Sequence, residues 1–263
     1  EIGSGLVGSE MCIRDRVTDG AFGENLVVSG YDFTKFPIGT RFTCKDVVLE
    51  LTQIGKECHH GCEIFQKMGE CIMPTNGVFA KVLHGGKISV GDEFHVQYRA
   101  AVITLSDTAS KGEREDASGA AVEEIVRKEG YEVVFKKIIP DDGDTLTALL
   151  CELSDEDKAD LILTTGGTGF SKRDNTPEAT MRAVERETPG ISEAMRYYSL
   201  QITPRAMLSR GVSGIRKEAL IVNLPGSPKA VRECLEYAIG ALTHGIDTVS
   251  YTHLRAHETG AYL

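Results

Sequence analysis

The sequence predicts an α/β domain built on a parallel sheet with helices on both faces, preceded by a smaller all-β part. Three observations carry this prediction. From residue 99 onwards, short apolar runs alternate with stretches of helical periodicity. A glycine-rich loop at 164–169 directly follows one of these apolar runs. Before residue 99, short runs of strand-forming residues are separated by Gly and Pro, which favours a barrel-like β structure.

The second part alternates between strand and helix patterns. The expected strands are 100–105, 131–139, 161–163 and 219–223. The expected helices are 118–129, 145–153, 176–186, 192–200 and 228–242. Ser227 is the expected N-cap of the last helix, with Pro228 at its first position. Because βαβ connections return the chain to the same end of a sheet, we expect three layers with the sheet in the middle.

The first part reads as a set of short strands. They are expected at 25–28, 41–44, 47–52, 77–83 and 93–98, with turn signals at 37–40 and 84–87. The two ends, 1–16 and 250–263, have no clean period and resemble foreign sequence; ordinary disordered termini are the alternative. We therefore expect an all-β part at 17–98 and an α/β part at 99–249.

The bulk composition excludes some functions. The 263 residues are 41% hydrophobic, enough for a core, and carry a formal net charge of −10. Nucleic-acid and membrane-surface binding are disfavoured because both need basic surfaces. No apolar run approaches the length of a membrane span. Without a secretory signal pattern, and with seven unevenly placed cysteines, the chain is expected in the cytoplasm.

The loop 164–169 (TTGGTG) joins a buried strand to a helix start. Glycines permit a tight turn whose N–H groups converge on an anion, and the helix N-terminus adds partial positive charge. A phosphate site is the functional interpretation, and a simple tight turn is the alternative. The loop contains neither the P-loop lysine pattern nor the dinucleotide fingerprint.

Three further loops follow expected strands, at 106–110, 139–142 and 223–228. Since parallel strands end at one edge of a sheet, all four loops should surround one ligand. Asp141 and Asp174 are the expected magnesium ligands on this edge; a turn residue and a helix-terminal charge are the respective alternatives. Four cations could neutralise the negative charge of the ligand, or simply be solvated: Arg173, Arg210, Arg216 and Lys217.

Four segments of the second part resemble the MoaB/Mog family of molybdenum-cofactor biosynthesis, and the resemblance covers about residues 100–249. They are TTGGTG…RDNTPEAT at 164–180, PGISEAMR at 189–196, LSR at 208–210 and IVNLPGSP at 221–228. The resemblance implies magnesium-dependent transfer of AMP from ATP to molybdopterin, which gives adenylyl-molybdopterin and pyrophosphate. It also implies a homotrimer. A molybdopterin-binding protein without catalysis is the alternative.

The resemblance also implies roles for particular residues. The family's two key aspartates fall on Asp141 and Asp174, as catalytic groups and metal ligands. The substrate-binding residues are expected to be Ser106, Asp107, Gly166, Gly167, Thr168, Gly169, Pro225, Gly226 and Ser227. The substrate's own phosphate is the nucleophile, so the protein needs only to align two anions and neutralise charge.

Segments of the first part resemble MOSC domains, which handle cofactor sulfur: GAFGENL at 20–26, PIGT at 37–40 and LTQIGKEC at 51–58. Only the C-terminal part of such a domain is covered. The reactive thiol is expected at Cys58. Zinc binding by Cys58, His59, His60, Cys62 and Cys71 is one alternative, and buried inert cysteines are another. A fusion of two such domains predicts channelling of an unstable pterin and contact with other proteins of the pathway.

Overall fold

The computed structural model describes residues 2–6, 24–30, 32–56 and 73–250. The chain divides into two compact units, with the division between Gln97 and Tyr98. The domain limits expected from the sequence, including the foreign-looking ends, stay predictions. Cys58, Cys62 and Cys71 lie outside the described residues, so the thiol or zinc site expected there also stays a prediction.

The first unit contains a six-stranded sheet in the order β2-β1-β5-β4-β3-β6. All pairs are antiparallel except β1 with β2. Its strands are β1 (Ile2–Leu6), β2 (Leu26–Val27), β3 (Arg41–Cys44), β4 (Val47–Ile54), β5 (Val78–His84) and β6 (His95–Val96). The short elements η1 (Phe33–Lys35) and α2 (Met73–Asn76) accompany them. This is the partial all-β structure that the Gly- and Pro-punctuated sequence predicts.

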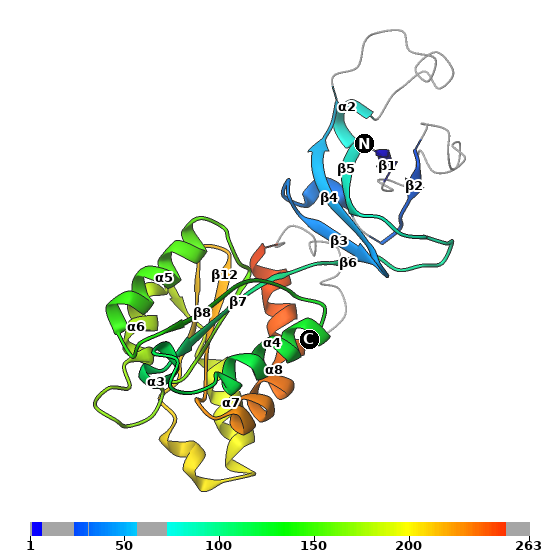
Figure 1. Cartoon of the computed structure of the whole chain (residues 1–263). Coiled ribbons are helices and arrows are strands. Elements are labelled where there is room, and N and C mark those ends of the chain that lie inside the picture. Colours follow the sequence, from blue (N-terminus) through cyan, green and yellow to red (C-terminus); the bar gives the residue numbers. More distant parts are fainter. Residues whose placement is uncertain (1, 7–23, 31, 57–72, 251–263) are drawn as a thin grey trace, which may run out of the picture. The chain divides into compact units, whose positions relative to one another are not determined.

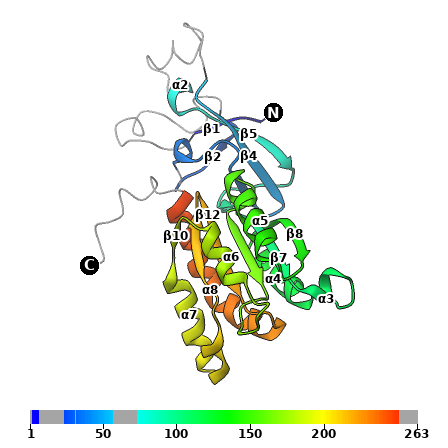
Figure 2. The ribbon, with the colours of Figure 1, turned by 90° about the vertical axis from the view of Figure 1, so that its left-hand side faces the viewer.

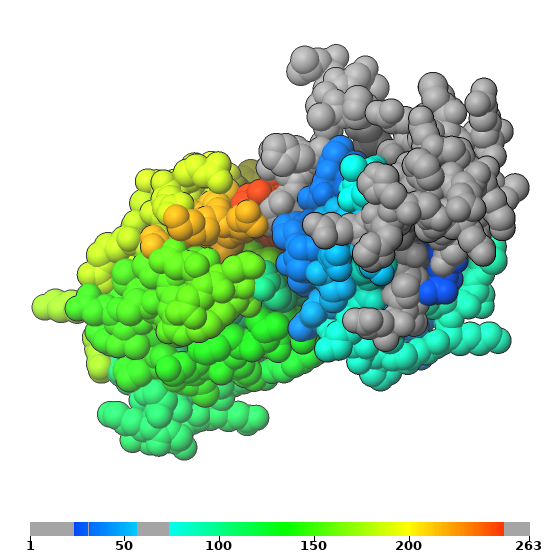
Figure 3. Space-filling model, turned by 90° about the horizontal axis from the view of Figure 1, so that it is seen from above, coloured from blue at the N-terminus to red at the C-terminus, as the bar shows by residue number. Residues whose placement is uncertain are grey.

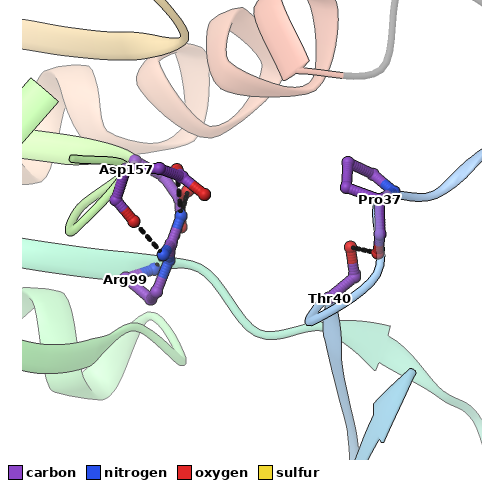
Figure 4. Close-up of polar contacts among 5 residues, drawn as sticks. Pro37, Thr40, Arg99 and Asp157 are labelled. Atoms are coloured by element: carbon purple, nitrogen blue, oxygen red, sulfur yellow. Dashed lines mark hydrogen bonds and ion pairs between the residues drawn. The ribbon is translucent and has the colours of Figure 1, made fainter. Parts of the chain in front are cut away.

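Three phenylalanines, one of them in β3, pack together in the core of this unit. The ring centroid of Phe42 lies 4.9 Å from that of Phe33 and 5.0 Å from that of Phe36. The expected turn at 37–40 follows Phe36, where the Thr40 hydroxyl donates to the Pro37 carbonyl at 2.8 Å (Figure 4). These contacts fix the start of β3, which begins and ends where the sequence predicts.

The second unit is built on a sheet in the order β10-β11-β12-β9-β7-β8. Its strands are β7 (Arg99–Leu105), β8 (Glu132–Ile139), β9 (Leu161–Thr165), β10 (Arg186–Glu187), β11 (Ser213–Arg216) and β12 (Ala219–Leu224). The four expected strands are parallel, which confirms the predicted α/β class. The antiparallel edge formed by β11 and β10 was not expected.

Helices cover both faces of this sheet. Figures 1 and 2 show α5 and α6 on one face and α4, α7 and α8 on the other. The bounds are α4 (Ala117–Lys128), α5 (Gly143–Asp155), α6 (Thr176–Ala183), α7 (Pro189–Leu200) and α8 (Pro228–Ser250), with the short α3 (Asp107–Ser110) and η2 (Pro204–Leu208). Strands β9 and β12 are buried along their whole length because helices pack on both sides.

Three helix ends have clear physical causes. The Asp116 carboxylate accepts from the N–H of Gly119 at 2.8 Å, so α4 begins at Ala117. Ser227 caps α8 as predicted, with its hydroxyl accepting from the N–H of Ala230 at 3.2 Å. Helix α6 ends three residues before the expected position, because the chain turns into β10 to pair with β11.

Ion pairs hold the start of β7. A guanidinium nitrogen of Arg99 lies 2.7 Å from a carboxylate oxygen of Asp157 (Figure 4). It also lies 2.7 Å from a carboxylate oxygen of Asp160. Burial, together with the charges of Asp157 and Asp160, raises the pKa of the nearby Glu218.

Among the described helices, none combines the length and apolar character of a membrane span.

Candidate functional site

The order of the parallel strands places a crevice at one edge of the sheet. Strand β7 comes first along the chain, and it lies between β8 on one side and β9 on the other. The connections that leave β7 and β8 therefore lead to opposite sides of β7. Ligands of open α/β sheets bind at such a switch point, beyond the carboxyl ends of the strands. Leu105 and Thr165 end the two strands there, and the loop 166–169 follows Thr165.

Close packing requires the glycines of this loop. Gly166 has φ +100°, and a Cβ there would lie 2.3 Å from the carbonyl oxygen of Leu105. Gly167 has φ +63°, and its Cβ would lie 2.3 Å from the Thr176 hydroxyl. A Cβ on Gly226, from the next loop, would lie 3.3 Å from the Cα of Gly166. The two loops therefore pack backbone to backbone.

Hydrogen bonds hold the carbonyl groups of the loop 166–169. Thr176 donates to the first two carbonyls, from its hydroxyl at 2.9 Å and its N–H at 3.2 Å. Arg210 donates to the last two, from its N–H at 2.9 Å and its Nε at 2.7 Å. Among the described residues, no hydrogen bond uses the N–H groups of 167–169. Donors on a loop fixed in this way are available to an anion.

The loop after β12 is tied to the same place. The Thr165 hydroxyl donates to the carbonyl of Pro225 at 2.6 Å. The Ser118 hydroxyl, at the start of α4, donates to the carbonyl of Gly226 at 2.7 Å. These contacts connect the ends of β9 and β12 with the start of α4.

Two aspartates from neighbouring loops form reciprocal hydrogen bonds, in which the carboxylate of each accepts from the backbone N–H of the other. The N–H of Asp107 donates to a carboxylate oxygen of Asp141 at 3.3 Å, and the N–H of Asp141 donates to one of Asp107 at 3.2 Å. Arg173 forms an ion pair with Asp107. Beside it, the Asp174 carboxylate accepts from the N–H of Ser171 at 2.8 Å. Long-range contacts therefore bring the loops that carry Asp141 and Asp174 together.

The environment of Asp141 raises the pKa of its carboxyl above the ordinary value. Burial raises the pKa of this half-buried carboxyl, and the charges of Asp107 and Asp174 raise it further. The hydrogen bond from Asp107 and the charge of Arg173 oppose this effect without cancelling it. A cation placed against Asp141 would relieve the repulsion between these carboxylates.

A cavity of about 220 Å³ opens between these loops, and we call it the carboxylate cavity. Five side chains on it are charged: Arg114, Glu115, Asp116, Asp141 and Asp174. Of the expected site residues, the structure places six on it: Ser106, Asp141, Gly166, Gly167, Asp174 and Gly226. The two residues predicted as metal ligands and half of the glycine loop therefore line the same cavity.

A second cavity of about 280 Å³ lies on the other side of the glycine loop. Thr168, Gly169 and Pro225 line this second cavity, together with Arg196 and Arg205. Two expected residues line neither cavity. Asp107 acts on Asp141 from outside the carboxylate cavity, and Ser227 caps α8.

The sequence interpretation missed several polar residues of the site. Asp116 accepts from the Thr104 hydroxyl at 2.9 Å while it caps α4, and Ser118 holds Gly226. An aspartate just before a helical pattern is an N-cap signal that could have found Asp116. The four expected cations are all engaged by carboxylates or carbonyl groups of described residues. Arg173 and Arg210 are engaged at the site itself, and Arg216 and Lys217 away from it.

The carboxylates suit one kind of metal site. In the described part of the chain, no group of three or more His, Cys, Asp or Glu is arranged to hold a metal ion. Magnesium in phosphate-transfer sites needs only one or two carboxylates, because substrate phosphates supply further ligands. Asp141 and Asp174 on one cavity meet this requirement.

The fold and the site define an α/β domain in which a glycine loop and two carboxylates meet at the switch point of the sheet. Residues 101–244 match the family model described as a probable molybdopterin binding domain, and the chain belongs to this family. Residues 7–95 match the MOSC domain model. Both resemblances expected from the sequence motifs are therefore confirmed.

Named relatives share the second unit. A molybdopterin adenylyltransferase of Helicobacter pylori is 41% identical over 159 residues, which cover 60% of this chain and 90% of that protein. One of Escherichia coli is 44% identical over 155 residues, with 56% and 79% covered. The crystal structure of a molybdopterin biosynthesis enzyme MoaB from Thermus thermophilus aligns with TM-score 0.56 and 43% identity, over 59% of this chain and 97% of that one.

Proposed function

We propose that the second unit transfers AMP from ATP to the terminal phosphate of molybdopterin. One observation carries the proposal: Asp141 and Asp174 line the same cavity as the glycine loop, at the switch point of the sheet. Relatives named molybdopterin adenylyltransferase, at 41% and 44% identity, support the choice of reaction.

In this reaction the protein itself needs to form no covalent bond with either substrate. A phosphate oxygen of molybdopterin attacks the α-phosphorus of ATP, the bond from that phosphorus to the bridging oxygen breaks, and pyrophosphate leaves. Because the nucleophile belongs to the substrate, the protein's task is to align two anions and stabilise charge. The N–H groups of the glycine loop do this from a backbone that Thr176 and Arg210 hold in place.

The two cavities provide one place for each substrate. We assign the phosphates of ATP to the carboxylate cavity, because its acidic lining requires a cation and polyphosphates bring one. We assign molybdopterin to the second cavity, because its two arginines, Arg196 and Arg205, outnumber its one carboxylate, Glu233, and suit an anionic pterin. The glycine loop lies between the two and touches both ligands.

Asp141 and Asp174 would hold magnesium, which when bound neutralises phosphate charge. Asp107 positions Asp141 through the two reciprocal hydrogen bonds, and Ser171 orients Asp174. The homotrimer and the cytoplasmic location expected from the sequence are part of this proposal.

The test is product formation by the full chain. Purified protein with molybdopterin, ATP and Mg²⁺ should form adenylyl-molybdopterin and release pyrophosphate. Asp141→Asn and Asp174→Asn should each lower kcat by a factor on the order of 100 or more. Asp144→Asn is the matched control, because this exposed carboxylate pairs with Arg182 outside the carboxylate cavity and should leave kcat unchanged.

Normal ATP and molybdopterin binding without any product would overturn the enzyme proposal. It would favour the alternative of a molybdopterin-binding protein that does not catalyse the transfer.

A further inference from the structure

The carboxylate cavity has an unbalanced charge. Four of its lining side chains are acidic and one is basic, Arg114. A polyphosphate bound in this cavity adds further negative charge. The two positive charges of a magnesium ion held by the carboxylates do not offset all of it. A cation from the protein is therefore the missing part of a polyphosphate site.

Arg114 is available for this role. The structure describes no ion pair or hydrogen bond of its guanidinium with any residue in the described ranges. By contrast, Arg173 pairs with Asp107, and Arg210 pairs with Glu178. Of the lining residues of the carboxylate cavity, Arg114 is the one with a cationic side chain.

The position of Arg114 indicates which phosphates it meets. It lies on the exposed segment 111–115 after α3, in a region that projects from the body of the second unit in Figures 2 and 3. Gly166 and Thr165, which are buried, line the inner part of the same cavity, beside the half-buried Asp141 and Asp174. With the α-phosphorus near the two aspartates, a triphosphate that points outward brings its terminal phosphates to the outer arginine.

We infer that Arg114 binds the β- and γ-phosphates of ATP and so stabilises the departing pyrophosphate. The inference rests on the proposed adenylyl transfer. A guanidinium suits the role because its planar fork binds two phosphate oxygens at once and stays charged at all physiological pH values. Charge builds on the bridging oxygen as the bond to the α-phosphorus breaks, and with the triphosphate pointing outward that oxygen leaves toward Arg114.

The experiment compares three nucleotides on the full chain. Calorimetric titrations with ATP, ADP and AMP are made in the presence of Mg²⁺. Arg114→Gln should weaken ATP binding about tenfold, ADP binding somewhat less, and AMP binding not at all. Arg114→Lys should recover part of the loss, because it keeps the charge without the fork. Lys111→Gln is the matched control, since Lys111 lies in the same exposed segment but does not line the cavity.

Three results would overturn the inference. They are equal loss of AMP and ATP affinity in Arg114→Gln, unchanged ATP affinity in that variant, and an equal loss in Lys111→Gln. If the unaltered chain binds no ATP, the proposed function fails as well. If the unaltered chain makes product while Arg114→Gln binds ATP normally, only the role of Arg114 fails.

Discussion

Gly166→Ala is the sharpest perturbation of the glycine loop, because the structure supplies both parts of its cost. The backbone at Gly166 has φ +100°, a conformation that L-residues rarely adopt. In addition, the new Cβ would lie 2.3 Å from the Leu105 carbonyl oxygen, which belongs to a buried strand and not to a flexible side chain. The end of β7 or the loop must therefore move by about 1 Å to reach van der Waals contact.

The magnitude follows from these two parts. The backbone conformation costs about 1–2 kcal/mol. The overlap with a packed strand end costs about another 1–3 kcal/mol. The free energy of unfolding should therefore fall by about 2–5 kcal/mol, a large share of the 5–15 kcal/mol typical of a domain. The displaced loop should also lose at least tenfold in ATP affinity.

Gly130→Ala is the matched control. Gly130 has φ +86°, but no atom lies within 4 Å of its added Cβ, so only the conformational cost remains. Urea unfolding of both variants and titration with ATP and Mg²⁺ measure the two effects. The proposed cost of close packing at Gly166 is refuted if Gly166→Ala is no less stable than Gly130→Ala and binds ATP as well as the unaltered chain.

Three further predictions concern residues around the site and the start of the sheet. Ser118→Ala removes the donor to the Gly226 carbonyl, so steady-state kinetics should show a KM for ATP raised severalfold, with about 1 kcal/mol lost in stability. Asp107→Asn removes one charge that raises the pKa of Asp141, so the acid limb of the kcat/KM profile should move to lower pH; an unmoved limb would contradict this. Glu218 has a native pKa above its ordinary 4.5, so the native state binds more protons and loses stability as pH rises through that window. Glu218→Gln should therefore be more stable than the unaltered chain by about 0.2–1 kcal/mol at pH 7 and equal to it at pH 4 in urea unfolding.

The sequence predicted the elements that have strong local signals. Strands β7, β9 and β12 are apolar runs buried along nearly their whole length, and Ser227-Pro228 marks the start of α8. The β11–β10 edge was missed because Ser213–Arg216 is short and has little apolar character. Its pairing with β12 depends on a tight turn in which Lys217 has φ +52°, and composition does not signal that turn.

The site was predictable where a motif follows a strand and unpredictable where long-range contacts decide. The order of the loops along the chain placed Asp141 and Gly166 on one edge, and both line the carboxylate cavity. The pairing of Arg173 with Asp107 could not be derived from periodicity, and neither could the place of Arg114 on the cavity. Arg114 follows an irregular turn, where side-chain direction has no simple period.

The most direct test of the central claim is a crystal structure of the full chain with Mg²⁺ and a non-hydrolysable ATP analogue. We expect the α-phosphate at the N–H groups of 167–169 and the metal ion between Asp141 and Asp174. We expect the outer phosphates to lie within hydrogen-bond distance of Arg114. An analogue bound with its phosphates outside the carboxylate cavity, or a metal ion that touches neither aspartate, would contradict the account.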